Sequence, residues 1–86
     1  MVFITAVHMA GGVKHEHIAD VKWKDPADGK TGESTRQAVV EFINGGGQAN
    51  VTGGLNTAPV HVYEIHYLRT RPDGKWSDNL LALPRY

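Results

Sequence analysis

The sequence contains no cysteine. Without thiols, the chain has no disulfide framework, no zinc site of the cysteine type, no iron–sulfur cluster and no thiol nucleophile. Neither sign of charge is in excess, since nine Lys and Arg residues balance nine Asp and Glu residues. This balance excludes a strong long-range field toward nucleic acid or anionic lipid and leaves only local charged patches for recognition.

Long hydrophobic runs are absent as well. No stretch approaches the roughly 18 consecutive apolar residues that a membrane-spanning helix needs. The apolar residues 1–7 lack a basic flank and a small-residue cleavage site, and His8 interrupts them, so we expect no signal peptide. The sequence therefore predicts a cytoplasmic protein with no membrane contact.

The length of the chain, 86 residues, is too small for two hydrophobic cores. We therefore expect one small domain over residues 1–86. A domain of this size buries only about 60–65% of the surface that its unfolded chain exposes. The free energy of unfolding is therefore expected to be small, and binding to a partner or to a second copy would increase it.

Four segments have the patterns of β-strands. Residues 2–9 are dense in β-branched and aromatic types and residues 15–24 alternate, which predicts a β-hairpin over residues 2–24. Residues 48–52 predict a short strand, and residues 60–69 predict a long one rich in Val, Ile and Tyr. The alternation in the second segment predicts a core-facing set of His15, His17, Ala19, Val21 and Trp23.

One helix is predicted at about residues 35–44. Ser34 and Gln37 have the spacing of a capping box, in which two side chains satisfy free N–H groups at a helix start. Gly45 is a typical residue after a helix end. The polar residues 25–33 before the helix are expected to form a connector without regular structure.

The predicted element order is β-β-α-β-β followed by a tail. This order predicts an α+β fold, in which a small antiparallel sheet carries one main helix on one face. A Gly-rich loop is expected at residues 53–59. Edge strands of so small a sheet stay open to a strand from a partner or from a second copy.

Three histidines form a candidate metal site. His15 and His17 are two positions apart on one predicted strand, and the predicted hairpin brings His8 near them. Three imidazoles can hold zinc with a fourth position open to water, in a structural or a hydrolytic site. The alternative is that these side chains are half-buried residues at a strand end and that the protein has no cofactor.

Basic and aromatic residues are interleaved in residues 67–76, around a predicted β-turn. Such a mixture can stack on bases and bind phosphates, and a helix start can hold an anion. Weak nucleic-acid binding is therefore an alternative, although the zero net charge disfavours it. Solvated charges at a hairpin tip would explain the same pattern. The candidate contact residues are Lys30, Arg36, Arg69, Arg71, Lys75 and Trp76.

The tail after the last predicted strand combines turn formers, cap formers and leucines spaced to dock one apolar face. We interpret it as a structural latch that pins the tail to that strand, with Arg69 bridging Asp78 across the turn. The predicted latch residues are Arg69, Asp73, Gly74, Asp78, Asn79, Leu80, Leu83 and Pro84.

The segment "YLRTRPDGKWSDNLLALPRY" resembles a family of short, mostly bacterial proteins known as a domain of unknown function. The family pattern is Y-[LI]-R-[ST], a short turn ending in D-G, then D-N-L, two residues and L-P. The upstream stretches "ITAV", "HEHI" and "TGESTR" are similar to one subgroup, so the resemblance covers nearly the whole chain. It implies a self-contained domain and a bacterial cytoplasmic origin, and it implies no activity, substrate or catalytic residue.

No Ser/His/Asp arrangement and no pair of carboxylates flanking a cleft can be identified in the sequence. We therefore expect a non-enzymatic binding or interaction module, with an unidentified protein or a second copy as its partner. The zinc site and weak nucleic-acid binding remain the alternatives.

Overall fold

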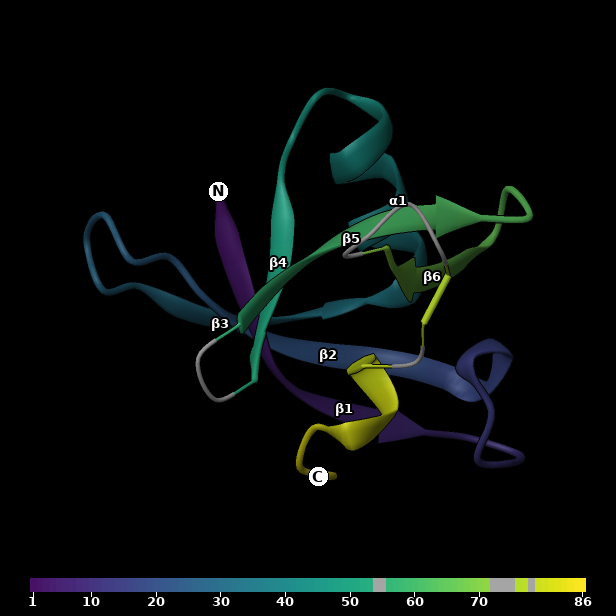
Figure 1. Ribbon diagram of the computed structural model, residues 1–86. Coiled ribbons are helices and arrows are strands. Elements are labelled where there is room, and N and C mark those ends of the chain that lie inside the picture. The colour runs from purple at the N-terminus through teal and green to yellow at the C-terminus, as the bar shows by residue number, and fades with distance from the viewer. Residues whose placement is uncertain (54–55, 72–75, 78) are drawn as a thin grey trace.

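The computed structural model describes residues 1–53, 56–71, 76–77 and 79–86. Figure 1 shows the strands β1 (Val2–Met9), β2 (Ile18–Lys24), β3 (Thr31–Thr35), β4 (Ala49–Gly53), β5 (Asn56–Tyr63) and β6 (Tyr67–Thr70). The helices are α1 (Arg36–Asn44) and the short 3-10 helices η1 (His15–His17) and η2 (Asn79–Ala82). Within the described ranges, no helix is both long and apolar enough to cross a membrane.

The strands form one six-stranded sheet in the order β3-β2-β1-β4-β5-β6. Neighbours in this sheet are antiparallel except for β1 and β4, which are parallel. The prediction of a purely antiparallel sheet is therefore wrong at its centre. A parallel pair needs a long crossover, and the segment between β1 and β4 supplies one because it contains β2, β3 and α1.

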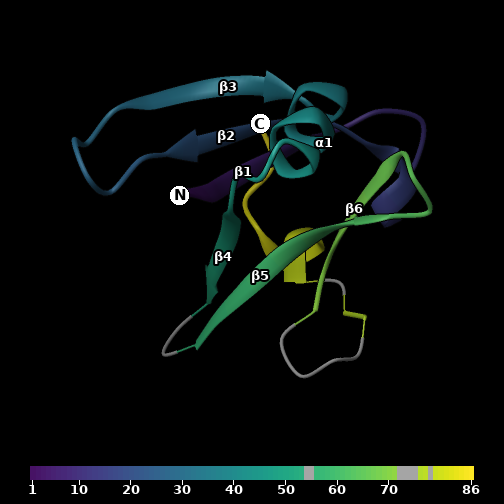
Figure 2. The same cartoon turned by 90° about the horizontal axis from the view of Figure 1, so that it is seen from above.

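Helix α1 lies between the two halves of the sheet (Figure 2). It contacts β2 and β3 on one side and β5 and β6 on the other. Val39 and Val40 of the helix are buried in the same core as Ile4, Val21 and Leu68 of the strands. The amphipathic helix thus fills the space between the two halves, which is where its apolar stripe is removed from water.

The helix predicted at about residues 35–44 is confirmed, but its cap is one residue later than expected. The Oγ1 atom of Thr35 accepts a hydrogen bond of 3.1 Å from the N–H of Ala38. Ser34 still belongs to β3, and its Oγ accepts a hydrogen bond of 3.0 Å from Nε1 of Trp23. The hydroxyl of Ser34, predicted to cap the helix, therefore bonds Trp23 of the neighbouring strand β2 instead.

The last residues of the chain continue the sheet beside β1. The pairing of β1 with β4 covers two residue pairs at the start of β1. Further along, the N–H of Val7 donates to the oxygen of Pro84 (2.9 Å), and the N–H of Tyr86 donates to the oxygen of Val7 (3.2 Å). Helix η2 places Leu80, only 1% exposed, among β1, β4 and β6. The tail therefore closes the opening between β1 and β4.

Three predictions for residues 25–69 need correction. The connector predicted at residues 25–33 ends in an edge strand, β3, which is polar on both faces and so carries no apolar alternation. The strand predicted over residues 60–69 is two strands, β5 and β6, joined by a turn at residues 64–66. Strand β5 also begins within the loop predicted at residues 53–59. The sheet is larger than expected for these reasons.

The second predicted strand is wrong at its start, because residues His15–His17 form η1 instead. Its predicted core-facing set also changes. Ile18 and Val21 are both buried, although strict alternation would place them on opposite faces. The register with β1 shifts between His8 and Met9, and such a bulge changes which side chains face the core.

Candidate functional site

Strands β5 and β6 carry cations and aromatic rings on their outward face. Leu68 and Thr70 of β6 are fully buried, so the residues that alternate with them point away from the core. These residues pair directly across the hairpin, as His61↔Arg69 and Tyr63↔Tyr67. Direct cross-strand pairs bring side chains into contact, which places a guanidinium and an imidazole beside two phenol rings.

Three guanidinium groups lie over three of the rings. Each is within the roughly 6 Å at which a cation is attracted to the face of an aromatic ring. The distances from guanidinium Cζ to ring centroid are 4.8 Å for Arg69 over Tyr63, 5.1 Å for Arg71 over Trp76 and 5.2 Å for Arg36 over Tyr67. Residues from α1, β6 and the tail therefore converge on one patch.

Edge-to-face contacts join these rings into a continuous series. His15 of η1 lies between the two tyrosines, so a third element enters the patch. The centroid distances are 5.2 Å for His15–Tyr63, 6.0 Å for His15–Tyr67, 4.8 Å for Tyr63–Trp76, 6.4 Å for His61–Trp76 and 6.5 Å for His66–Tyr67. All of these separations are typical of attractive ring pairs.

We call this patch the cation–aromatic surface. Its side chains are half-buried or exposed, and the set contains three arginines and three histidines. Trp76 is 36% exposed. The members are His15, Arg36, His61, Tyr63, His66, Tyr67, Arg69, Arg71 and Trp76.

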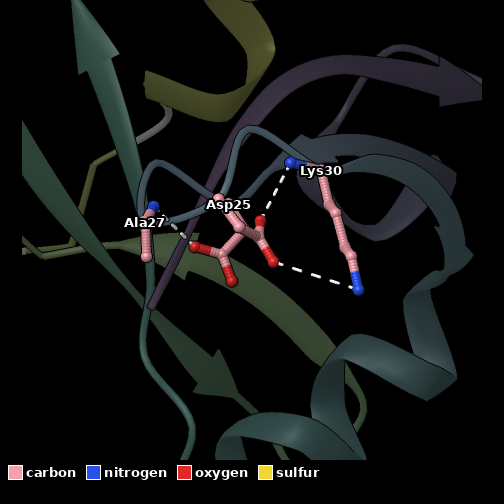
Figure 3. A network of polar contacts seen from close by, with 4 residues as sticks. Asp25, Ala27 and Lys30 are labelled. Carbon is pink, nitrogen blue, oxygen red and sulfur yellow. Dashed lines mark hydrogen bonds and ion pairs between the residues drawn. The ribbon is translucent and has the colours of Figure 1, made fainter.

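The structure brings together four of the six candidate anion contacts and separates a fifth. Lys30 lies in the β2–β3 turn, at the other end of the molecule from β6 (Figures 1 and 2). Its N–H donates to Oδ1 of Asp28 (2.9 Å), and its Nζ is 4.0 Å from Oδ2 of the same residue (Figure 3). Asp25 braces that turn by accepting a bond from the N–H of Ala27. Lys75 lies outside the described residues.

The predicted metal ligands have separate partners. His8 Nδ1 hydrogen-bonds the main-chain oxygen of Tyr86, His17 Nδ1 accepts from the N–H of Lys14 (3.2 Å), and His15 contacts the tyrosine rings. In the described part of the chain, no three His, Cys, Asp or Glu residues lie close enough to share a metal ion. Zinc stays a prediction, which the zinc content of untagged protein would test.

The turn that joins β5 to β6 is strained. Glu64 and Ile65 have positive φ angles of 50° and 71°, a region that disfavours side chains with a Cβ and β-branched ones most. The N–H of His66 donates to the oxygen of Glu64 (2.8 Å), which holds the turn tight. Ile65 is also 75% exposed. Strain of this kind gathers at functional sites, and here it adjoins the cation–aromatic surface.

Ile65→Gly is expected to raise the free energy of unfolding by about 1 kcal/mol, because glycine removes the cost of a left-handed Cβ. Urea denaturation followed by tryptophan fluorescence measures the change. Ile65→Ala is the matched control, since it shortens the same exposed side chain but keeps the Cβ, and we expect it to stay within about 0.5 kcal/mol of the parent. Equal effects of the two variants would show that the turn is not strained.

A buried hydroxyl at the end of β6 forms hydrogen bonds with the tail. Thr70 is 0% exposed, and its Oγ1 donates to the oxygen of Ser77 (3.1 Å) and accepts from the N–H of Asn79 (3.2 Å). The Ser77 N–H in turn donates to the oxygen of Thr70 (2.8 Å). Arg69 lies in the cation–aromatic surface, and its predicted bridge to Asp78 falls outside the described residues.

Of the other predicted latch residues, some lie within the described ranges and others do not. Leu80 and Leu83 pack in or against the core, and the oxygen of Pro84 bonds to Val7. Asp73 and Gly74 lie outside the described residues. The latch role itself stays a prediction.

The ring of Tyr86 lies on the outer face of β1 and β2. Nζ of Lys22 is 4.5 Å from its centroid, and its hydroxyl is buried without a hydrogen-bond partner among the described residues. Burial raises the pKa of the Tyr86 phenol above its ordinary value of 10.0, and the carboxylates of Glu33 and Asp20 raise it further. The neutral phenol is therefore favoured, as an apolar anchor for the tail.

Strand β3 is the clearest open edge of the sheet. It pairs with β2 on one side and lies at one end of the strand order. Its middle residue is Glu33, opposite Lys22. Two copies joined by antiparallel β3 edges centred there would place like charges opposite each other, which is destabilising. Self-association by strand addition in this one register is therefore disfavoured.

Five members of the surface were not among the predicted anion contacts, namely His15, His61, Tyr63, His66 and Tyr67. For His61, Tyr63 and Tyr67 the signal was present as alternation with Arg69 along residues 60–70. A continuous strand would place these side chains in one row along a single face. Only the turn pairs His61 with Arg69 and Tyr63 with Tyr67, and the sequence did not predict that turn. Glu64 and Ile65 are not turn-forming types, so no residue marks that turn.

These features define a class: a small mixed α and β protein with a six-stranded sheet, one main helix and a surface of cations on aromatic rings. A family model described as "Protein of unknown function (DUF3892)" matches residues 3–84, and the chain belongs to this family. Neither a curated protein nor a solved structure matches the chain. The family description carries no activity, so a functional argument rests on the geometry of the surface.

Proposed function

We propose that the protein is a non-enzymatic binding module whose recognition surface is the cation–aromatic surface and whose partners carry negative charge. Three arginine–ring contacts on one patch support this proposal most directly. Energetically significant contacts of this type occur about once per 70–80 residues. Three on one patch of a chain of 86 residues are more than this frequency predicts.

The chemistry of these groups suits recognition more than catalysis. A guanidinium stays protonated at all physiological pH values, so it cannot shuttle a proton as a general acid or base. It offers a planar fork of N–H donors that matches carboxylate and phosphate groups. A ring beneath it limits the rotamers of the long side chain, which lowers the entropy lost on binding.

The distribution of charge supports a local patch on a neutral chain. Four of the nine acidic residues lie on β2, β3 or the turn between them: Asp20, Asp25, Asp28 and Glu33. The cation–aromatic surface carries three arginines, and the β2–β3 turn with Asp25 and Asp28 lies at the other end of the molecule from β6. Asp20 is the exception, since it pairs with Thr35 beside Arg36. Zero net charge limits long-range attraction, but it leaves short-range contacts at the patch intact.

Titration with inorganic polyphosphate and polyglutamate tests the proposal. We expect Arg69→Gln with Arg71→Gln to weaken polyanion binding by at least about 10-fold, since two charge-assisted contacts are lost. The matched control is Lys24→Gln with Lys30→Gln. It removes the same charge from two exposed residues, one at the end of β2 and one in the β2–β3 turn. Isothermal calorimetry measures affinity, and circular dichroism checks the fold of each variant.

Equal weakening by both pairs of substitutions would show that binding is diffuse and would overturn the assignment of the surface. The proposal also fails if the parent protein binds none of the polyanions, including single-stranded DNA.

A further inference from the structure

We infer that the cation–aromatic surface binds single-stranded nucleic acid, an inference that rests on the proposed function and adds the ligand class. The surface presents two kinds of group side by side, aromatic rings and the guanidinium groups that lie over three of them. A single-stranded polynucleotide presents the complementary series, flat bases joined by phosphates. A carboxylate polymer such as an acidic peptide matches the arginines but gives the rings nothing to stack on.

The spacing along the surface fits this ligand. Successive ring centroids from His61 through Trp76, Tyr63, His15 and Tyr67 to His66 are 4.8 to 6.5 Å apart. The series therefore extends over several rings, whereas a site for one nucleotide needs one or two. Single-strand sites on small domains cover about 4 nucleotides or more, and each stacked base contributes without regard to its identity.

Unpaired strands fit better than a duplex. The faces of bases in a duplex are occupied by their neighbours, so rings at the protein surface have no base face to contact. Binding to a duplex through phosphates alone relies on many cations. This surface has three arginines, on a chain with no net charge. Stacking must therefore supply much of the affinity.

The small number of cations fixes the salt dependence. For single strands, the slope of log K against log salt concentration is about −0.7 for each phosphate neutralised. Three arginines therefore predict a slope of about −2. Loss of one arginine lowers the magnitude of the slope by about 0.7, whereas loss of a ring lowers affinity with the slope unchanged.

Fluorescence anisotropy with labelled 12-mers tests the inference. The ligands are single-stranded DNA and RNA of one mixed sequence, the corresponding duplex DNA, and an abasic phosphodiester of the same length and charge. We expect the single strands to bind at least about 5-fold more tightly than the abasic polymer, the loss of one stacked base being worth about 5- to 150-fold. The ratio of RNA to DNA affinity shows which of the two the surface prefers.

Variants separate the two kinds of contact. Trp76→Ala is expected to weaken single-strand binding by about 5- to 150-fold at constant salt slope, because the residue is exposed and supplies a ring. Arg71→Gln is expected to lower the slope by about 0.7. Lys30→Gln is the matched control for charge, and both its affinity and its slope should equal those of the parent.

The outcomes are distinguishable. If the abasic polymer, the duplex or polyglutamate binds as tightly as the single strands, the bases are not recognised and this inference is wrong, while the proposed anion-binding function stands. Single-strand recognition by the surface is equally wrong if Trp76→Ala leaves single-strand affinity unchanged. If no polyanion binds, the proposed function is wrong as well.

Discussion

Leu80→Ala is expected to lower the free energy of unfolding by about 2–5 kcal/mol, the usual cost of removing a buried leucine side chain. Leu80 is 1% exposed and lies in the same core cluster as residues of β1, β4 and β6. Removal of three side-chain carbons from this position leaves a cavity at the opening between β1 and β4. A domain of this size has a total stability of only about 5–15 kcal/mol, so the loss is large.

Urea denaturation followed by tryptophan fluorescence measures this effect. Val13→Ala is the control, since it also truncates an apolar side chain but at a position that is 75% exposed. We expect the control to change stability by at most about 0.5 kcal/mol. If both variants unfold at the same urea concentration, helix η2 is not part of the core and the tail does not close the sheet.

Thr70→Val is expected to lower the free energy of unfolding by about 1–3 kcal/mol, the cost of leaving buried polar groups without a partner. Valine has nearly the same shape as threonine, so no cavity forms. The hydroxyl it removes serves the oxygen of Ser77 and the N–H of Asn79 within one turn of chain. Because Thr70 adjoins Arg69 and Arg71, the substitution also loosens the support of the cation–aromatic surface.

Thermal unfolding in parallel with Thr31→Val checks the role of the hydroxyl. Thr31 is an exposed residue of the edge strand β3, where the same change in shape and polarity is expected to cost at most about 0.5 kcal/mol. A Thr70→Val protein as stable as the parent would show that the hydroxyl does not fasten the tail to β6.

The sequence predicts the elements in which periodicity and burial agree. Strand β1 and helix α1 have strong apolar patterns, and their predicted bounds differ from the observed ones by at most a residue. Strand β3 has no such pattern, because an edge strand with polar residues on both faces gains its stability from backbone pairing alone. The break between β5 and β6 leaves no mark either, since the strained residues at the turn are glutamate and isoleucine.

The candidate site was predictable only in pieces. Arg69, Arg71 and Trp76 are close together in the sequence, so their mixture of charge and ring character is visible there. Arg36 and His15 reach the same surface from α1 and η1, and only the curvature of the sheet around the helix brings those elements together. Contacts between segments this far apart depend on tertiary structure, which local patterns do not encode.

An NMR titration of the isotope-labelled protein with a single-stranded 12-mer tests the central claim most directly. We expect the largest shift changes at the backbone and ring signals of Tyr63, Tyr67, Arg69 and Trp76, with Lys30 and the residues of β3 unaffected. Changes concentrated on the open edge of β3, or spread evenly over all lysines and arginines, would contradict the claim that the cation–aromatic surface is the recognition site.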